Sequence, residues 1–123
     1  MLVDTCVLIE HFKGNVSVSE FLKSHMGKLS ISSVTDMGMA QGVRDKKELR
    51  IYEQLLRSLS INIIEIDEGV SLKARLWVRT YGLSHNLCLA DSLIAATAFS
   101  ANLTVVTFNI KDFRFLDLEL LSP

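Results

Sequence analysis

Proline and cysteine are scarce in this chain. Its 123 residues include two cysteines, and the only proline is the last residue. Cys6 and Cys88 are too few for a disulfide framework and lack metal-ligand spacing, so we expect a reducing cytoplasm and two small buried thiols. Linkers, repeats and low-complexity stretches are also missing, which predicts a single domain over residues 1–123.

Long apolar runs and a large net charge are missing as well. No apolar run approaches the roughly 20 residues that span a bilayer. Asp4 and Glu10 interrupt the N-terminus where a secretory leader would be apolar, so we expect a cytoplasmic protein with no membrane partner. The net charge is −1, so binding of a nucleic acid would need a local patch. The hydrophobic content of 49% favours a surface buried against a partner or a second copy, as in a homodimer.

Two groups of cations and three histidines are candidates for binding roles. The cations gather near Lys46 and near Arg75, but acids are interleaved, and we interpret both groups as solvated faces. His11, His25 and His85 lack ligand spacing, and we expect them on the surface.

Strand patterns alternate with helix patterns along the chain. Short apolar or β-branched runs predict strands at residues 1–3, 29–33, 61–66, 103–107 and 118–121, the last one at a sheet edge. Amphipathic segments between them predict helices, including one over 45–59 and one over 89–100 that stops at Asn102. We expect Thr35 and Asp67 to cap helices and Leu8, Ile9 and Phe12 to share an apolar face. This alternation predicts a three-layer α/β/α sandwich with a central, mainly parallel sheet.

Three aspartates fall at the ends of predicted elements. Asp4 ends the first strand, Asp91 lies near the start of the helix over 89–100, and Asp112 follows the strand over 103–107. In a parallel sheet these positions share one edge, where ligands bind. Carboxylates held together raise one another's pKa values, and a divalent cation such as Mg²⁺ would relieve that repulsion.

Four segments carry a family resemblance. VDTCVLIE at Val3 to Glu10, LADSLIAATA at Leu89 to Ala98 and TFNIKDF at Thr107 to Phe113 resemble three signature blocks of the PIN-domain family, most closely those of VapC-type toxins from toxin–antitoxin pairs. ISSVTDMGMAQG at Ile31 to Gly42 is similar to the remaining block in spacing.

The resemblance implies a Mg²⁺- or Mn²⁺-dependent endoribonuclease that acts on RNA and binds an antitoxin. It assigns Asp4, Asp91 and Asp112 as the catalytic and metal-binding acids. The family's fourth acid is usually a Glu, but here its position holds Gly38. Asp36 lies two residues away on the same helix and points elsewhere, so it cannot stand in.

Asn109, Thr5 and Cys6 lie in the same motifs as the aspartates. Asn109 is a candidate for orienting Asp112 or a water, and Thr5 for binding a water or phosphate. A turn and a helix cap are the plain alternatives for these two residues. Cys6 stands where the family usually has Asn, and its soft sulfur is a poor ligand for Mg²⁺.

Two other functions compete with the nuclease. A chain that lacks the family Glu can keep the fold and bind an antitoxin, or associate with itself, without turnover. A phosphorelay receiver has a similar length and fold class, but it needs paired acids after the first strand, where Asp4 stands alone. Its phosphoacceptor would end the third strand, where Asp67 is better explained as a helix cap.

Overall fold

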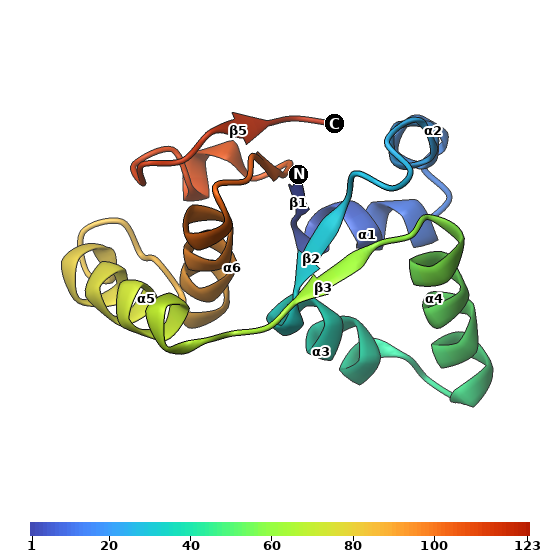
Figure 1. Ribbon diagram of the computed structural model, residues 1–123, viewed down its shortest axis with the longest axis horizontal. Helices are drawn as coiled ribbons and strands as arrows, with labels where there is room; N and C mark the ends of the chain where they lie inside the picture. Colours follow the sequence, from blue (N-terminus) through green and yellow to red (C-terminus); the bar gives the residue numbers. More distant parts are fainter.

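Five short parallel strands form the centre of the molecule. The computed structural model describes all residues from 1 to 123, and the sheet order is β3-β2-β1-β4-β5 (Figure 1). The strands are β1 (Leu2–Val3), β2 (Ser30–Ser32), β3 (Asn62–Ile64), β4 (Val105–Val106) and β5 (Leu120–Leu121). All four neighbouring pairs are parallel, as the alternation of strand and helix patterns predicts.

Helices cover both faces of this sheet. They are α1 (Thr5–Phe12), α2 (Val16–Ser24), α3 (Ser33–Gly42), α4 (Lys46–Ser58), α5 (Glu68–Tyr81), α6 (Leu89–Ala101) and the 3-10 turn η1 (Ile110–Asp112). Figure 1 shows α5 and α6 on one side of the strands and α1, α2 and α4 on the other. The three-layer prediction is therefore confirmed. Each helix is too short or too polar to cross a bilayer.

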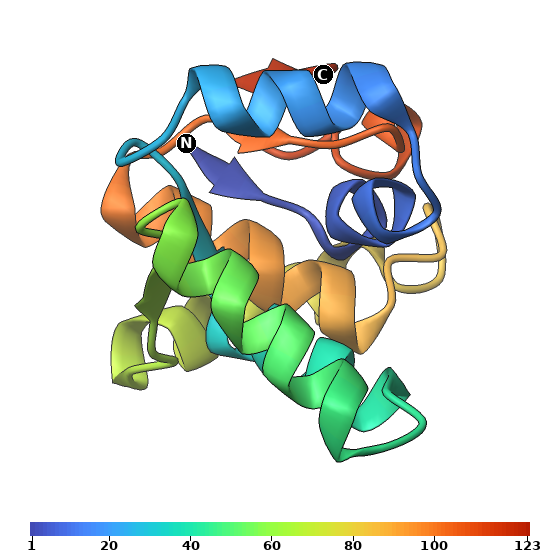
Figure 2. The ribbon, with the colours of Figure 1, turned by 90° about the vertical axis from the view of Figure 1, so that its right-hand side faces the viewer.

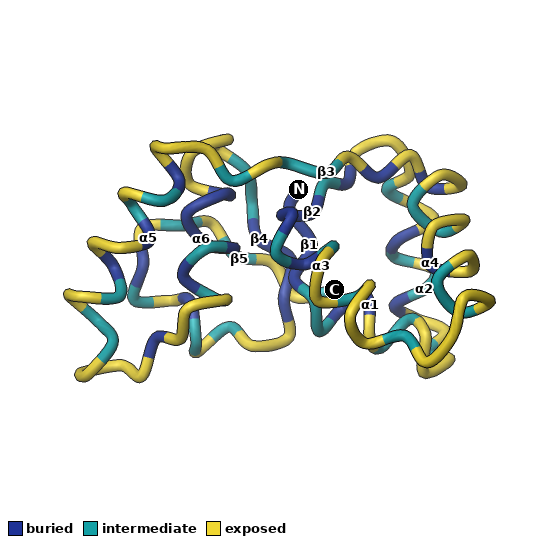
Figure 3. Tube along the Cα trace, turned by 90° about the horizontal axis from the view of Figure 1, so that it is seen from below, coloured by how far each residue is buried: buried dark blue, intermediate teal, exposed yellow.

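The two helical layers have separate apolar cores. In the first, Val7 and Leu8 of α1 pack with Tyr52 of α4 against the sheet. In the second, Ala74 and Trp77 of α5 pack with alanines of α6. The buried segments accordingly run through the middle of the molecule, and the exposed ones follow its outer sides (Figure 3). Small residues in α6 let it lie close to α5, as an apolar helix buried on most of its surface requires.

Side-chain caps set most helix starts. Asp4, Asn15, Ser32, Asp45 and Asp67 each accept a hydrogen bond from a backbone N–H of the following first turn. The caps at Asp45 and Asp67 agree with the expected helix boundaries. Asn102 ends α6 in the left-handed conformation, with φ 54°, as predicted.

Some local expectations are wrong. Ser32 caps α3, and Thr35 is buried within that helix because its hydroxyl faces α1. The strand over 61–66 is not fully buried, since β3 lies at an edge of the sheet. In α1, Ile9 and Phe12 stay 43% and 41% exposed, and Val7 takes the buried position beside Leu8.

Candidate functional site

Asp4 lies where β1 ends and α1 begins. Val3 of β1 is in register with Val106 of β4, so the two strands end side by side. The backbone N–H of Asp4 donates to the carbonyl of Val106 at 2.9 Å, which fixes its main chain beside the end of β4. The same residue caps α1, so its side chain turns toward the carboxyl edge of the sheet.

Three groups donate hydrogen bonds to the carboxylate of Asp4, which is only 3% exposed. The backbone N–H of Thr5 donates to Oδ1 at 2.8 Å. The hydroxyl of Thr107 donates to Oδ2 at 2.8 Å, and the thiol of Cys6 lies 3.4 Å from the same oxygen. These three donors hold the carboxylate of Asp4 in one orientation.

Thr107 connects Asp4 to the loop after β4. Its hydroxyl accepts a hydrogen bond from the backbone N–H of Asn109 at 2.9 Å while it donates to Asp4. The side chain is completely buried. The sequence predictions missed this residue. Its position offered a signal, because Thr107 ends one predicted strand as Asp4 ends another.

Asp91 is the third residue of α6 and reaches the same region from the opposite layer. Burial raises the pKa of Asp91 above its usual value of 3.8, and the negative charges of Asp4 and Asp112 raise it further. A hydrogen bond with Cys88 acts in the other direction. The three aspartates therefore interact electrostatically, and their repulsion makes Asp91 harder to ionise.

A cavity of about 520 Å³ holds the centre of this site. Asp4 and Asp91 line it together with Asn109, Thr5 and Gly38. Asp112 is half-buried in η1 and does not line the cavity. The structure thus brings two of the three predicted acids into one cavity and places the third near enough to influence Asp91.

The side-chain oxygen atoms that line the cavity are suitable ligands for a hard cation. Carboxylate and amide oxygens are the ligands that Mg²⁺ prefers, often one or two carboxylates with waters. Burial raises the pKa of Asp91 most, the charges of Asp4 and Asp112 add to the rise, and no cation of the chain is among the groups that act on it. However, no group of three His, Cys, Asp or Glu side chains lies close enough together to hold a metal ion. Metal binding by Asp4, Asp91 and Asp112 stays a prediction.

Gly38 faces the cavity from α3. It is exposed, and a Cβ atom added there would meet no other atom within 4 Å. Gly38 also lines a neighbouring groove of about 540 Å³ between α1, α3 and α4. Because this glycine borders both spaces, the wall between them lacks a side chain at that point, and a longer residue has room there.

Asp36 does not replace the missing acid. Its carboxylate accepts a hydrogen bond from the hydroxyl of Tyr52 on α4 at 2.7 Å. Burial raises the pKa of Tyr52, and the hydrogen bond to Asp36 adds to this rise, so the phenol stays a donor. Asp36 ties α3 to α4 and is absent from the lining of the acidic cavity, as expected.

The structure shows the contacts of Thr5 and Asn109, whose roles the sequence left open. The hydroxyl of Thr5 donates to the hydroxyl of Thr35 at 3.0 Å, and Asp4, not Thr5, caps α1. Asn109 is exposed, and its carbonyl accepts the backbone N–H of Asp112 at 2.9 Å. Thr5 therefore helps to join α1 to α3, and Asn109 sets the backbone turn into η1.

The cysteines are both free thiols. Cys6 is half-buried, and burial raises its pKa. Cys88 is exposed, so its predicted burial is wrong. It lies in the cap position of α6, outside the packed part of that helix, although its side chain makes no capping hydrogen bond.

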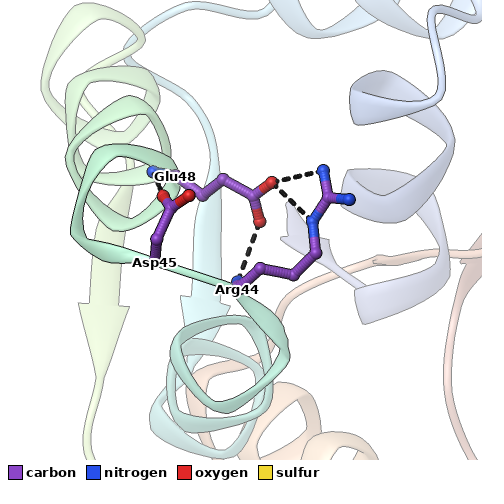
Figure 4. Close-up of polar contacts among 3 residues, drawn as sticks. All are labelled: Arg44, Asp45 and Glu48. Atoms are coloured by element: carbon purple, nitrogen blue, oxygen red, sulfur yellow. Dashed lines mark hydrogen bonds and ion pairs between the residues drawn. The ribbon is translucent and has the colours of Figure 1, made fainter.

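One cation of each cationic group makes a contact within the fold. At the start of α4, Arg44 forms an ion pair with Glu48 at 2.7 Å, and the backbone N–H of Glu48 donates to Asp45 (Figure 4). In α5, the ammonium of Lys73 lies over the rings of Trp77 and Phe99. Solvent screens an exposed ion pair, so this contact occupies the Arg44 cation without stabilising the fold appreciably.

Comparisons with known proteins agree with this architecture. The PIN domain model matches residues 1–117. Ribonuclease VapC10 of Mycobacterium tuberculosis is 34% identical, with coverage of 100% of this chain and 91% of that protein. Among solved structures, FitAcB from Neisseria gonorrhoeae has a TM-score of 0.79 at 26% identity, with 99% of this chain and 96% of that chain covered. A toxin–antitoxin complex from Klebsiella pneumoniae has a TM-score of 0.78 at 28% identity, with the same coverage. This chain therefore belongs to the PIN domain family and, within it, to the VapC group.

Proposed function

We propose that this chain is a divalent-metal-dependent endoribonuclease, the toxin of a toxin–antitoxin pair, which hydrolyses RNA phosphodiester bonds. One observation carries the proposal: Asp4 and Asp91 meet in one cavity at the carboxyl edge of the sheet, where the charge of Asp112 also acts. The relative from Mycobacterium tuberculosis is named a ribonuclease, which supports the same reaction.

Mg²⁺ or Mn²⁺ is the cation that we assign to this site, with Asp4 and Asp91 as direct ligands and Asp112 as the third acid. Such a cation lowers the pKa of water and neutralises charge on a phosphate. Thr107 and Thr5 hold the carboxylate of Asp4 in one orientation through their hydrogen bonds. Asn109, at the cavity wall, offers an amide that can orient water or substrate.

The first experiment is RNA cleavage with added Mg²⁺ or Mn²⁺. Asp91→Asn keeps the shape of the side chain and removes the charge, so we expect cleavage and growth arrest to be abolished. Asp117→Asn is the matched control, because Asp117 is exposed and away from the cavity, and it should retain full activity. Full cleavage by Asp91→Asn would refute the proposed site.

Gly38 favours a second candidate, a PIN-fold module that binds a partner without turnover. Its position leaves the cavity with one acid fewer than the family pattern has. Isothermal titration with Mn²⁺ separates the two candidates. The nuclease predicts binding that Asp4→Asn removes, whereas the inactive module predicts no binding until Gly38→Glu restores a carboxylate.

Gly38→Glu has a clear steric basis, since its Cβ enters open space. We expect it to tighten Mn²⁺ binding by at least about tenfold, the size of effect that contacts around a metal have. Gly38→Ala is the control for helix propensity, because it adds the methyl group without the charge. Equal Mn²⁺ affinity in both variants would show that position 38 does not reach the metal.

We also propose a cognate antitoxin as the protein partner, as in the complex from Klebsiella pneumoniae. Ile9, Phe12 and Ile51 line the groove beside Gly38, and each is more than 40% exposed. A surface of this kind is commonly covered by a partner. Self-association into a homodimer is the alternative use of exposed apolar surface, and light scattering of the isolated chain would detect it.

A further inference from the structure

An aromatic cluster, formed by Tyr81 at the end of α5, His85 in the loop between α5 and α6 and Phe115 after η1, lies outside the lining of the acidic cavity. The rings of His85 and Phe115 stack with centroids 4.3 Å apart and planes inclined by 27°. Tyr81 lies edge-on to His85 at 5.3 Å and inclined to Phe115 at 5.1 Å. Aromatic stacks of this kind are also surfaces on which nucleobases stack.

The backbone of the loop holds His85 outward. The N–H of His85 donates to the carbonyl of Tyr81 at 2.9 Å, and Asn86 takes a left-handed conformation with φ 55°. Leu87 then turns into the core, so the loop is anchored just after the exposed histidine. The hydroxyl of Ser84 lies 2.8 Å from Nδ1 of His85 and fixes the ring orientation.

This cluster borders both chain segments that carry the site's second and third acids. The loop leads directly into α6, which holds Asp91, and Phe115 follows Asp112 by three residues. In Figure 2 the loop between α5 and α6 and the chain after β4 lie on the same side as α1, which is the carboxyl edge of the sheet. A polymer bound in the acidic cavity can therefore continue over the cluster.

Unpaired cations lie on the same two segments. Ion pairs occupy only Lys13 and Arg44 in the whole chain. Lys111 and Arg114 are exposed beside Phe115, and Arg79 is exposed near the end of α5. Exposed cations next to stacked aromatic rings form the combination that binds single-stranded nucleic acid, because the cations contact phosphates while the rings contact bases.

We propose that the aromatic cluster stacks an unpaired base of single-stranded RNA beside the acidic cavity, with Lys111 and Arg114 contacting the adjacent phosphates. This inference rests on the proposed ribonuclease function and extends it to a subsite for one nucleotide. His85 supplies the exposed ring face, and Phe115 and Tyr81 support it from within.

The chain contains a matched control for this stack. His25 stacks near Phe21 with centroids 4.3 Å apart, and the hydroxyl of Ser24 lies 3.0 Å from its Nδ1. Phe21 lies in the last turns of α2 and His25 ends that helix just before β2, so the pair lies at the amino edge of the sheet, opposite the acidic cavity. His25 and His85 share the local chemistry and differ in location.

The experiment measures binding of a fluorescein-labelled single-stranded RNA of about ten nucleotides, long enough to cover one site. EDTA prevents turnover during the fluorescence anisotropy measurement. We expect His85→Ala to weaken binding about five- to a hundredfold, the range for loss of one stacked base. His85→Trp should restore binding through its larger ring, and His25→Ala should bind within about twofold of the wild type.

The salt dependence of RNA binding tests the proposed phosphate contacts separately. Arg114→Gln should reduce the slope of log affinity against log salt concentration by about one, whereas His85→Ala should leave the slope unchanged. Equal RNA affinity of His85→Ala and His25→Ala would overturn the proposal. So would a wild type that binds no RNA, or a His85→Ala variant that loses the antitoxin and keeps RNA. RNA that binds through His85 but is never cleaved with Mg²⁺ or Mn²⁺ would leave the subsite standing and refute the nuclease.

Discussion

Asp4 and Asp91 line the same cavity but are held in different ways. Asp4 is buried and accepts hydrogen bonds from Thr5, Thr107 and Cys6. Asp91 is half-buried, and burial together with the neighbouring charges raises its pKa. The comparison indicates that hydrogen bonds to the fold hold Asp4 in place. Asp91 is instead disfavoured in its ionised form, and a bound cation would stabilise that form.

The largest expected effect on stability comes from Asp4→Ala. The variant loses the cap of α1 and leaves the buried hydroxyl of Thr107 without its acceptor. We expect the free energy of unfolding to fall by about 2–3 kcal/mol. Urea denaturation measures this loss. Asp91→Ala is the comparison, and because Asp91 caps nothing, it should change the free energy of unfolding by less than about 1 kcal/mol.

Thr107→Val tests whether the hydrogen bond itself, and not burial, holds Asp4. The substitution keeps the volume and removes the donor, which leaves a buried carboxylate with one partner fewer, and we expect a loss of about 2 kcal/mol. Thr104→Val is the matched control, since Thr104 also donates to a carboxylate, that of Glu119, at an exposed site. Its effect should stay below about 0.5 kcal/mol. Equal losses at the two positions would contradict the distinction.

The smallest expected effect is a pH-dependent gain from Asp91→Asn. A carboxyl group whose pKa is raised in the folded state favours folding most below its ordinary pKa, and this contribution is lost as the pH rises through the folded value. At pH 7 the ionised Asp91 therefore destabilises the fold relative to Asn. We expect Asp91→Asn to be more stable by less than about 1 kcal/mol, because solvent screens a half-exposed group.

The gain should shrink as the pH falls through the folded-state pKa and vanish below 3.8, the usual pKa of Asp, because the wild-type carboxyl is then protonated in both states. Chemical denaturation of the wild type and Asp91→Asn over this pH range measures the difference. A gain that is constant with pH would show that the fold does not raise the pKa of Asp91. Added Mn²⁺ should reverse the order, because the cation stabilises only the chain that has the carboxylate.

The sequence predicted the fold well where local signals and tertiary packing agree. The strand after Asn102 and the helix capped by Asp67 are both present in the structure. The predictions failed where contacts between different segments determine the role of a residue. Thr35 has the chemistry of a cap, but Ser32 lies in the cap position, and Thr35 instead meets the hydroxyl of Thr5 from another helix.

The candidate site shows the same division. Position along the chain was enough to predict that Asp4 and Asp91 meet at one edge of the sheet, and the family resemblance implied that Gly38 stands at the position of an acid. The strand-end position of Thr107 was a signal, but it did not show which partner the hydroxyl would bind, and that partner, Asp4, is 103 residues away. The exposure of Cys88 likewise depends on how the loop before α6 folds.

The order of residues alone determined the alternation of strands and helices, and with it the single sheet edge at which the aspartates would gather, since the period of apolar residues is a local property. Only the tertiary structure decided which carboxylate is fixed by donors and which is left with a raised pKa. It also placed His85 in the loop that leads into α6, at the carboxyl edge of the sheet, and His25 at the amino edge. These outcomes depend on distances between segments far apart in the chain, which no local pattern encodes.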